Sequence, residues 1–347
     1  MRKALLALAL AACAHGTARS GESAPPPGLE VQDAVHGVRY TLPTGAETWQ
    51  VSREGTARAA SGVEAEVSAF PMARPTTPQQ CREHARTRLS GDKERETAGP
   101  PPDLPRDQSA EDSPTALWIF TTGPASAPLR NRWAFFARGA DCLVLHVTGP
   151  LQDAFAAQAF ATGAGNFQVL PLPEDRQREA DLLAGMGFLE RRDPASALER
   201  FEALASREPD NAKAHFGALM AGFELGPQGY ARALPHGTLA LRSDHDLSPE
   251  QRQLALRAMG VMQLAENHVR EAAETLAELV VRAPDLAEGQ YNYACALARM
   301  GDAQAALDHL RAAVRLDGDL AAHARQDEDL KSLRGSAAFD QLTGVPK

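Results

Sequence analysis

The sequence predicts an α+β sandwich, an antiparallel sheet with two helices, followed by an all-α solenoid. Between residues 30 and 172, apolar and polar residues alternate in short segments, which is the two-residue period of strands. From residue 173 onward, small residues, apolar residues and prolines recur about every 34 residues, which is typical of stacked helix pairs. A chain of 347 residues exceeds the usual size of one core, so two domains are expected.

The first 12 residues have the features of a signal peptide. Arg2 and Lys3 precede an apolar run, residues 4–12, that is too short to span a bilayer. The sequence LAAC at residues 10–13 resembles the lipobox of bacterial lipoproteins. The resemblance implies that Cys13 is lipidated, becomes the first residue of the mature chain and anchors it to a membrane. The alternatives are an ordinary secretory signal cleaved at an A-x-A site and a chance apolar start of a cytosolic protein.

The residues after the expected lipid site indicate where the protein is held. In the enteric sorting scheme that the resemblance implies, an Asp after the cysteine favours the inner membrane. Ala14 occupies that place, so the periplasmic side of the outer membrane is expected. Residues 13–29 are small, polar and proline-rich, and they predict a flexible tether.

Residues 30–172 are expected to form the sheet domain. The predicted strands are VRYTLP, WQVSREG, VEAEVSAFPM, TALWIFTTG, RWAFFARG and CLVLHVTG, and the helices are PQQCREHARTRLSG and the segment after Pro150. Residues 92–114 are charged and proline-rich without periodicity, and they predict a loop. The strand opening YTLP at residues 40–43 and a last helix bearing Phe155 and Phe160 resemble PsbP-like domains. That resemblance implies an accessory or binding role.

Residues 173–347 contain four copies of a helix-turn-helix pattern, starting at Arg178, Ala212, Gln253 and Ala287. Small residues recur where the two helices of a pair must cross, at Gly185, Gly260 and Ala294 in first helices and at Ala197, Ala272 and Ala306 in second helices. The pattern resembles the tetratricopeptide repeat. The copy from Ala212 is seven residues longer and degenerate, because Leu219 takes the small-residue place and Pro235 falls inside the second helix. An alanine-rich bundle without superhelical stacking is the alternative.

The segment RQDEDLKSLRGSAAFDQL, residues 325–342, resembles the tail of many bacterial tetratricopeptide arrays. Its expected role is a cap, because the last helix pair of a solenoid must be covered by a polar outer face.

The repeat resemblance implies a concave face that binds a protein or peptide partner. Phe216, Met220 and Phe223 share one helical face, which is expected either to form part of this groove or to be buried within the chain. The clamp by which some family members hold a terminal carboxylate is missing, since Leu182 and Met186 stand in its places. The residues that the register places in the groove are Leu182, Met186, Leu189, Lys213, Phe216, Met220, Phe223, Arg257, Val261, Leu264, Tyr291, Cys295 and Arg299.

Three cysteines remain once Cys13 is assigned to lipid. Cys81 and Cys142 both lie in the sheet half, whereas Cys295 lies in the last repeat. In an oxidising compartment Cys81 and Cys142 are the candidate disulfide pair. The alternative is that all three are small buried thiols.

The sequence offers little support for catalysis or for nucleic-acid binding. Its 36 basic and 45 acidic residues give a net charge of −9, which disfavours binding to nucleic acid. The common motifs for metal-dependent proteolysis, phosphate binding and serine hydrolysis are missing. The DHD at residues 244–246 supplies too few metal ligands, and His146 has no partner acid identifiable from sequence. No cofactor and no metal are therefore predicted.

These observations predict a membrane-anchored lipoprotein that acts as a non-catalytic interaction or scaffolding module. One alternative is a cell-envelope hydrolase or peptidase with its site in the sheet half, where His146 or His84 would lie beside a carboxylate in a cleft. The other is a ligand-binding accessory protein that uses the sandwich alone.

Overall fold

The N-terminal half is built on two antiparallel sheets, described in a computed structural model that covers residues 28–44, 47–52, 55–89, 95–96, 116–124, 126–242 and 246–344. The larger sheet has the strand order β3-β4-β5-β9-β8-β7-β6, and the smaller one has the order β1-β2-β10. The strands are β1 (Leu29–Asp33), β2 (Val38–Leu42), β3 (Trp49–Val51), β4 (Ala57–Ala59), β5 (Glu64–Pro71), β6 (Arg95–Glu96), β7 (Ala116–Thr122), β8 (Leu129–Arg138), β9 (Asp141–Pro150) and β10 (Gln168–Val169).

Alternation along the central strands gives the large sheet two apolar faces. In β9, Leu143 and Leu145 point to one face, where the small sheet and helix α2 (Ala154–Gly165) cover them. Val144 points to the other face, which is covered by helix α1 (Pro78–Leu89). The predicted α+β sandwich with two helices is thereby confirmed.

Short strands account for the differences from the sequence prediction. Within the loop predicted over residues 92–114, Arg95 and Glu96 form the short strand β6, which pairs with β7, and the rest of that loop lies outside the described residues. β1 begins at Leu29, the last residue of the expected tether. Strands of two to five residues show too little alternation to be recognised from sequence alone.

A disulfide joins helix α1 to the large sheet. Cys81 of α1 and Cys142 of β9 are bonded and fully buried. Cys295 is a buried free thiol. Cys13 and the expected signal segment lie outside the described residues.

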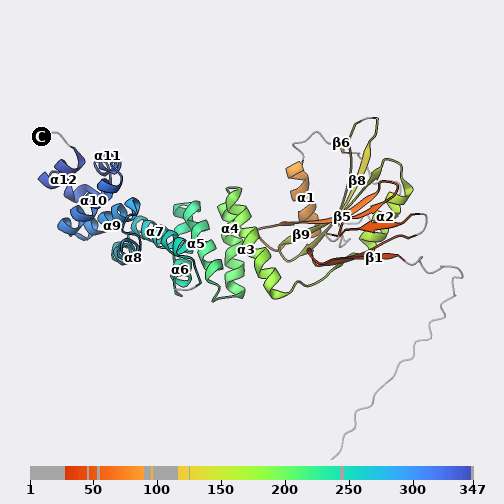
Figure 1. Cartoon of the computed structure of the whole chain (residues 1–347), viewed down its shortest axis with the longest axis horizontal. Helices are drawn as coiled ribbons and strands as arrows, with labels where there is room; N and C mark the ends of the chain where they lie inside the picture. Colours follow the sequence, from red (N-terminus) through yellow and green to blue (C-terminus); the bar gives the residue numbers. More distant parts are fainter. Residues whose placement is uncertain are drawn as a thin grey trace, which may run out of the picture.

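The C-terminal half is a run of antiparallel helix pairs that extends away from the sheets (Figure 1). The predicted solenoid of paired helices is confirmed. The helices are α3 (Glu174–Glu190), α4 (Pro194–Arg207), α5 (Ala212–Leu225), α6 (Pro227–Ala240), α7 (Pro249–Ala265), α8 (Val269–Arg282), α9 (Ala287–Met300) and α10 (Ala303–Leu316). The insertion predicted in the second copy lies between α6 and α7, and α6 continues through Pro235.

Side-chain caps mark where several of these helices begin. Asp193 caps α4 ahead of Pro194, and Asn211 caps α5. At α7, Ser248 and Gln251 form a reciprocal capping box, which satisfies two backbone N–H groups that the first turn leaves unpaired.

Glycines allow the helices to approach as closely as the repeat pattern predicts. The Phe201 ring lies between Gly185 and Gly217, where an added Cβ would come within 2.5 Å and 2.4 Å of ring atoms. Gly260 faces Leu276 in the same way, with a Cβ at 2.5 Å from that side chain. Any larger residue at these three positions would force the helices apart.

The tail folds back onto the last pair. It forms α11 (Leu320–Ala324), the 3₁₀ helix η2 (Glu328–Leu333) and α12 (Ala337–Thr343). Leu330, Leu333 and Phe339 are buried in the same core as α9 and α10. The tail thus covers apolar surface at the end of the array.

The two halves are joined by a buried ion network around Arg200 of α4. Its Nη2 lies 2.6 Å from Oδ1 of Asp141 at the start of β9 and 2.7 Å from Oδ1 of Asp181 on α3. Its Nη1 donates to the carbonyl of Met72 at 3.4 Å. A more exposed pair, Arg74 and Glu199, reinforces the same junction. The sheet half is therefore attached to the array through its first helix pair.

Candidate functional site

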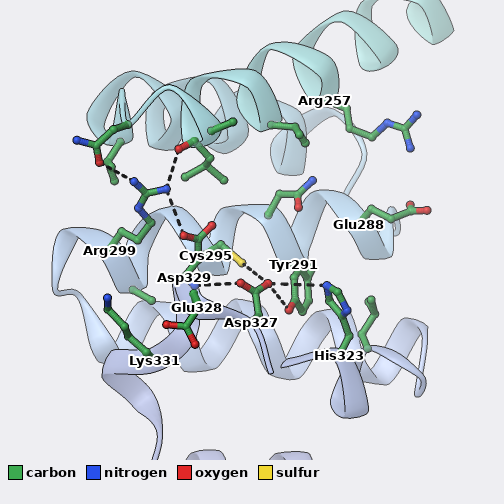
Figure 2. Close-up of a pocket in the computed structure, with 18 of the residues that line it drawn as sticks. Arg257, Glu288, Tyr291, Cys295, Arg299, His323, Asp327, Glu328, Asp329 and Lys331 are labelled. Carbon is green, nitrogen blue, oxygen red and sulfur yellow. Dashed lines mark hydrogen bonds and ion pairs between the residues drawn. The ribbon is translucent and has the colours of Figure 1, made fainter. Parts of the chain in front are cut away.

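The first helices of the last two repeats and the tail enclose a cavity of about 1090 Å³ (Figure 2). Its walls come from α7, α9, α11 and η2, with contributions from the end of α5 and from the turn between α7 and α8. We call the surface formed by the first helices α3, α5, α7 and α9 the inner face. Seven of the residues that the sequence places there line this cavity: Phe223, Arg257, Val261, Leu264, Tyr291, Cys295 and Arg299.

The other six predicted groove residues lie elsewhere along the inner face. Met186 is 53% exposed on α3, whereas Leu182 and Leu189 are half-buried beside the Phe188 core. Lys213 lines a separate cavity of about 410 Å³ together with Arg178 and Asp246. The remaining two, Phe216 and Met220, belong to the apolar stripe of α5.

That stripe is neither fully open nor covered by the sheet half. Phe216, Met220 and Phe223 are each half-buried and pack on the core formed by α5, α6 and α7. Phe216 also touches the cluster that contains Leu247 from the insertion. Their partly exposed surfaces continue the apolar inner face toward the large cavity.

The tail occupies the α9 side of the cavity, so three predicted partner-binding residues instead hold the chain's own cap. Figure 2 shows Asp327 between Tyr291, Cys295 and His323. The Tyr291 hydroxyl donates to Asp327 Oδ2 at 2.7 Å, and the Cys295 thiol donates to the same oxygen at 3.7 Å. Arg299 pairs with Asp329 at 3.2 Å. The physical reason is that residues 327–333 cross α9, where an external segment was expected.

Burial and charge determine the protonation of this cluster. Burial, followed by the hydrogen bond to Asp327, raises the pKa of the Tyr291 hydroxyl. Burial and the negative charge of Asp327 raise the pKa of the Cys295 thiol. Burial also raises the pKa of Asp329, although Arg299 opposes the shift. A thiol held protonated is a poor nucleophile and a poor metal ligand.

The same cluster brings three possible metal ligands together. Cys295 Sγ and carboxylate oxygens of Asp327 and Asp329 lie within 4.8 Å of one another. Each already has a hydrogen-bond or ion-pair partner in the chain, including the cation of Arg299. The arrangement therefore fits a structural cap contact better than a coordination site. The sequence analysis missed this cluster because the two aspartates follow the cysteine by 32 and 34 residues, so no short motif contains all three.

The sheet half carries a polar cluster around His146. Its Nδ1 lies 3.3 Å from Glu66 Oε1, and its Nε2 lies 2.7 Å from Thr148 Oγ1 and 3.0 Å from Asn131 Oδ1. The expectation that no acid accompanies His146 is thus corrected, because Glu66 is its neighbour on β5 in the paired register. Burial lowers the pKa of His146 despite the hydrogen bond to Glu66.

This cluster resembles a hydroxyl, base and acid array in its distances, but the Thr148 hydroxyl is shared with Asn131 at 3.1 Å. The cavities described here lie in the helical half, and His146 lines none of them. The other histidine considered, His84, stacks on Phe70.

A pair of histidines lies in the helical half, beside the second helices α4 and α6. His215 of α5 and His236 of α6 bring their Nδ1 atoms to 2.8 Å, and His215 Nε2 lies 2.9 Å from the Pro209 carbonyl oxygen. Both line a cavity of about 580 Å³. Burial, then the neighbouring His215, lowers the pKa of His236, while Glu202 opposes the shift.

Comparisons with known proteins locate the likeness in the helical half. No family model matches the chain, and a search of curated proteins gives no match. Among solved structures, MamA from Desulfovibrio magneticus RS-1 is 20% identical, with a TM-score of 0.38, covering 49% of this chain and 94% of its own. YrrB, a TPR protein with an unusual peptide-binding site, is 15% identical, with a TM-score of 0.38 and coverages of 50% and 90%.

PilF from Pseudomonas aeruginosa is 17% identical, with a TM-score of 0.25, covering 50% of this chain and 99% of its own. Similarities at this level of identity concern the fold alone and give no information about a binding partner of this chain. The tetratricopeptide-like character of the helical half rests on its own helix pairing and 34-residue spacing. The PsbP-like resemblance of the sheet half stays a prediction.

Proposed function

We propose that this protein is a non-catalytic interaction module that holds a polypeptide segment of a partner on its inner face. The observation that supports this most is the cavity of about 1090 Å³ between α7, α9 and η2, where the half-exposed Phe223, Val261 and Arg257 lie beside buried apolar side chains and exposed charged ones. The ion network to the sheet half comes from α4, so the sheet half does not account for this surface. Grooves between helices are a common site for peptide segments.

A hydrolase in the sheet half is supported less well. His146, Glu66 and Thr148 have suitable distances, yet the hydroxyl is shared with Asn131 and the cluster lines no described cavity. A general base needs both a substrate within reach and a proton to accept from a free nucleophile. We therefore place this cluster among the structural polar networks of the sheet.

The test of the proposed function compares two aspartate substitutions. Val261→Asp places a charge in the cavity, whereas Val281→Asp places the same charge on α8, where the side chain is 80% exposed. Tagged full-length variants are used to capture partners from cell-envelope extracts, and their thermal midpoints are measured in parallel. Partners lost with Val261→Asp and retained with Val281→Asp, at equal midpoints, support the inner face. Equal recovery from both variants refutes it.

A second comparison tests the apolar stripe. Replacing Phe216 and Phe223 together by alanine removes the half-buried rings that continue the groove from α5. Partner recovery is expected to fall below that of the wild type. Unchanged recovery from a folded double variant removes the stripe from the binding surface.

We also propose that the protein is attached through a lipid on Cys13 to the periplasmic side of the outer membrane, and acts there as a scaffold. The support is the lipobox-like LAAC sequence, followed by Ala14. Among the described residues, no helix has the length and apolar composition needed to cross a bilayer. Cys13→Ser is expected to move the protein from the membrane fraction to the soluble fraction. Unchanged fractionation contradicts lipid attachment.

A further inference from the structure

The tail segment Asp327–Leu333 shows which chemistry the inner face accepts. This segment, DEDLKSL, crosses α9 with its first and third carboxylates on Tyr291 and Arg299. Its serine hydroxyl donates to the carbonyl of Ala298 at 3.2 Å. Both leucines are buried in the core of the last pair. An acidic segment with spaced leucines is therefore already bound by the inner face of one repeat.

The preceding repeat presents the corresponding positions with different side chains, since Arg257, Val261 and Ala265 stand where α9 has Tyr291, Cys295 and Arg299, and the tail leaves this part of α7 open. α7 places Arg257 and Val261 at the positions that Tyr291 and Cys295 take on α9, 34 residues later. Phe223 and Leu264 extend the apolar part of that wall. Arg257 is half-exposed, and Figure 2 shows it on α7, apart from the contacts around Asp327.

The charges that line the cavity are unequally satisfied. Among its acids, Asp327 bonds Tyr291, Asp329 pairs with Arg299, and Glu328 pairs with Arg334 at 3.0 Å. Within the described part of the chain, the cations Arg257 and Lys331 have no carboxylate within 4.0 Å, and Glu288 has no cation within that distance. Among the described residues, the lining charges without an ion-pair partner are thus two positive and one negative, in a lining that holds three Arg or Lys and four acids overall. Against the larger effect of burial, the charge of Lys331 also acts to lower the pKa of Asp329.

From this geometry we propose that the open α7 side of the cavity binds an acidic, leucine-containing segment of a partner protein, lying beside the cap. Carboxylates of that segment pair with Arg257 and Lys331, and its leucines pack on the half-buried Phe223 and Val261. The inference rests on the proposed function and names the chemical class of the partner. Because the cations are half-exposed or exposed, their pairing sets specificity and weakens in salt.

Synthetic peptides test the proposal against the full-length protein. Three fluorescently labelled eight-residue peptides each contain two leucines. At three further positions, the first peptide carries aspartate, the second glutamine and the third lysine. Fluorescence anisotropy is expected to show the aspartate peptide binding about tenfold or more tightly than the lysine peptide, with affinity falling as salt rises. Equal affinity for the three peptides, or no binding of the aspartate peptide, overturns the proposal.

Charge-reversal variants locate the binding site. Arg257→Glu and Lys331→Glu are each expected to weaken the aspartate peptide several-fold and to strengthen the lysine peptide. Arg315→Glu makes the same charge change on the exposed end of α10, outside the cavity, and is expected to leave both affinities unchanged. Affinity for the aspartate peptide that is insensitive to Arg257→Glu, in a variant with a wild-type thermal midpoint, overturns the assignment.

The two proposals fail in different ways. If Val261→Asp still abolishes partner capture while the aspartate peptide shows no preference, the acidic class is wrong and the proposed function stands. If neither Val261→Asp nor Arg257→Glu changes any binding, the inner face itself is excluded.

Discussion

Replacing Arg200 by methionine is expected to destabilise the junction between the two halves strongly. The Arg200 side chain is 4% exposed, and its partners Asp141 and Asp181 are 11% and 3% exposed. Removing one partner of a buried ion pair costs about 3–5 kcal/mol, because the remaining charge is left without compensation. In the variant, Asp181 still pairs with Arg207 and Asp141 still pairs with Arg138. The expected loss of unfolding free energy is therefore near the lower limit, about 3 kcal/mol.

The three tryptophans make this measurement specific. Trp49, Trp118 and Trp133 all lie in the sheet half, so their fluorescence reports its unfolding, while far-UV circular dichroism is dominated by the helices. In urea the fluorescence midpoint of Arg200→Met is expected to fall by about 1 M. This shift is the expected loss of about 3 kcal/mol divided by the urea dependence of the unfolding free energy, about 2–3 kcal/mol/M. The fluorescence transition should then precede the dichroism transition.

Arg74→Met is the matched control at the same junction. Arg74 is 77% exposed, and an exposed pair with Glu199 contributes little. Its midpoint is expected to stay close to that of the wild type. If Arg200→Met and Arg74→Met unfold at the same urea concentration, the buried network does not join the halves and the reasoning fails.

The remaining predictions concern the disulfide, one close helix contact and the titration of His236. Reducing the bond between Cys81 and Cys142, which are 61 residues apart, is expected to lower the free energy of unfolding by about 4 kcal/mol, and an unchanged urea midpoint in dithiothreitol would count against it. Gly185→Ala is expected to cost about 1–3 kcal/mol, because its Cβ would meet the Phe201 ring, and calorimetry showing an unchanged melting temperature contradicts this. Because the pKa of His236 is lowered in the folded state, the unfolded state binds more protons, so stability is complete above the ordinary value of 6.5 and falls as the pH drops below it. Urea midpoints between pH 7.5 and 5.5 should therefore fall less for His236→Asn than for the wild type, and equal falls would exclude His236 as a contributor.

The repeat geometry could be predicted from sequence because its determinants are local and periodic. Gly185 and Gly260 are small because the facing helix carries Phe201 or Leu276, and both members of each contact lie within one repeat. The long strands could be predicted for the same reason, since alternation over eight to ten residues is visible in the sequence. The disulfide partners shared a half of the chain, but their spacing alone left the pairing open.

The junction and the cap contacts depend on tertiary placement that no local pattern encodes. Arg200 did leave a signal, because it lies on the apolar face of α4 between the buried residues Ala197 and Leu204. A lone arginine on such a face needs a buried acceptor, yet nothing in the sequence says that the acceptors are Asp141 and Asp181. The contacts of Asp327 could not be predicted either, because the repeat register assigned its partners Tyr291 and Cys295 to binding an external segment.

Both ends of the helical array are therefore closed by the chain itself, which leaves its middle as the surface available to a partner. At one end, the sheet half is joined through the ion network of Arg200. At the other, leucines and carboxylates of the tail cover α9. Between them, α5 and α7 present half-buried apolar side chains together with Arg257, which has no ion-pair partner among the described residues. An apolar wall with an unpaired cation gains most from a segment that brings leucines and carboxylates together, which is the composition of the chain's own tail.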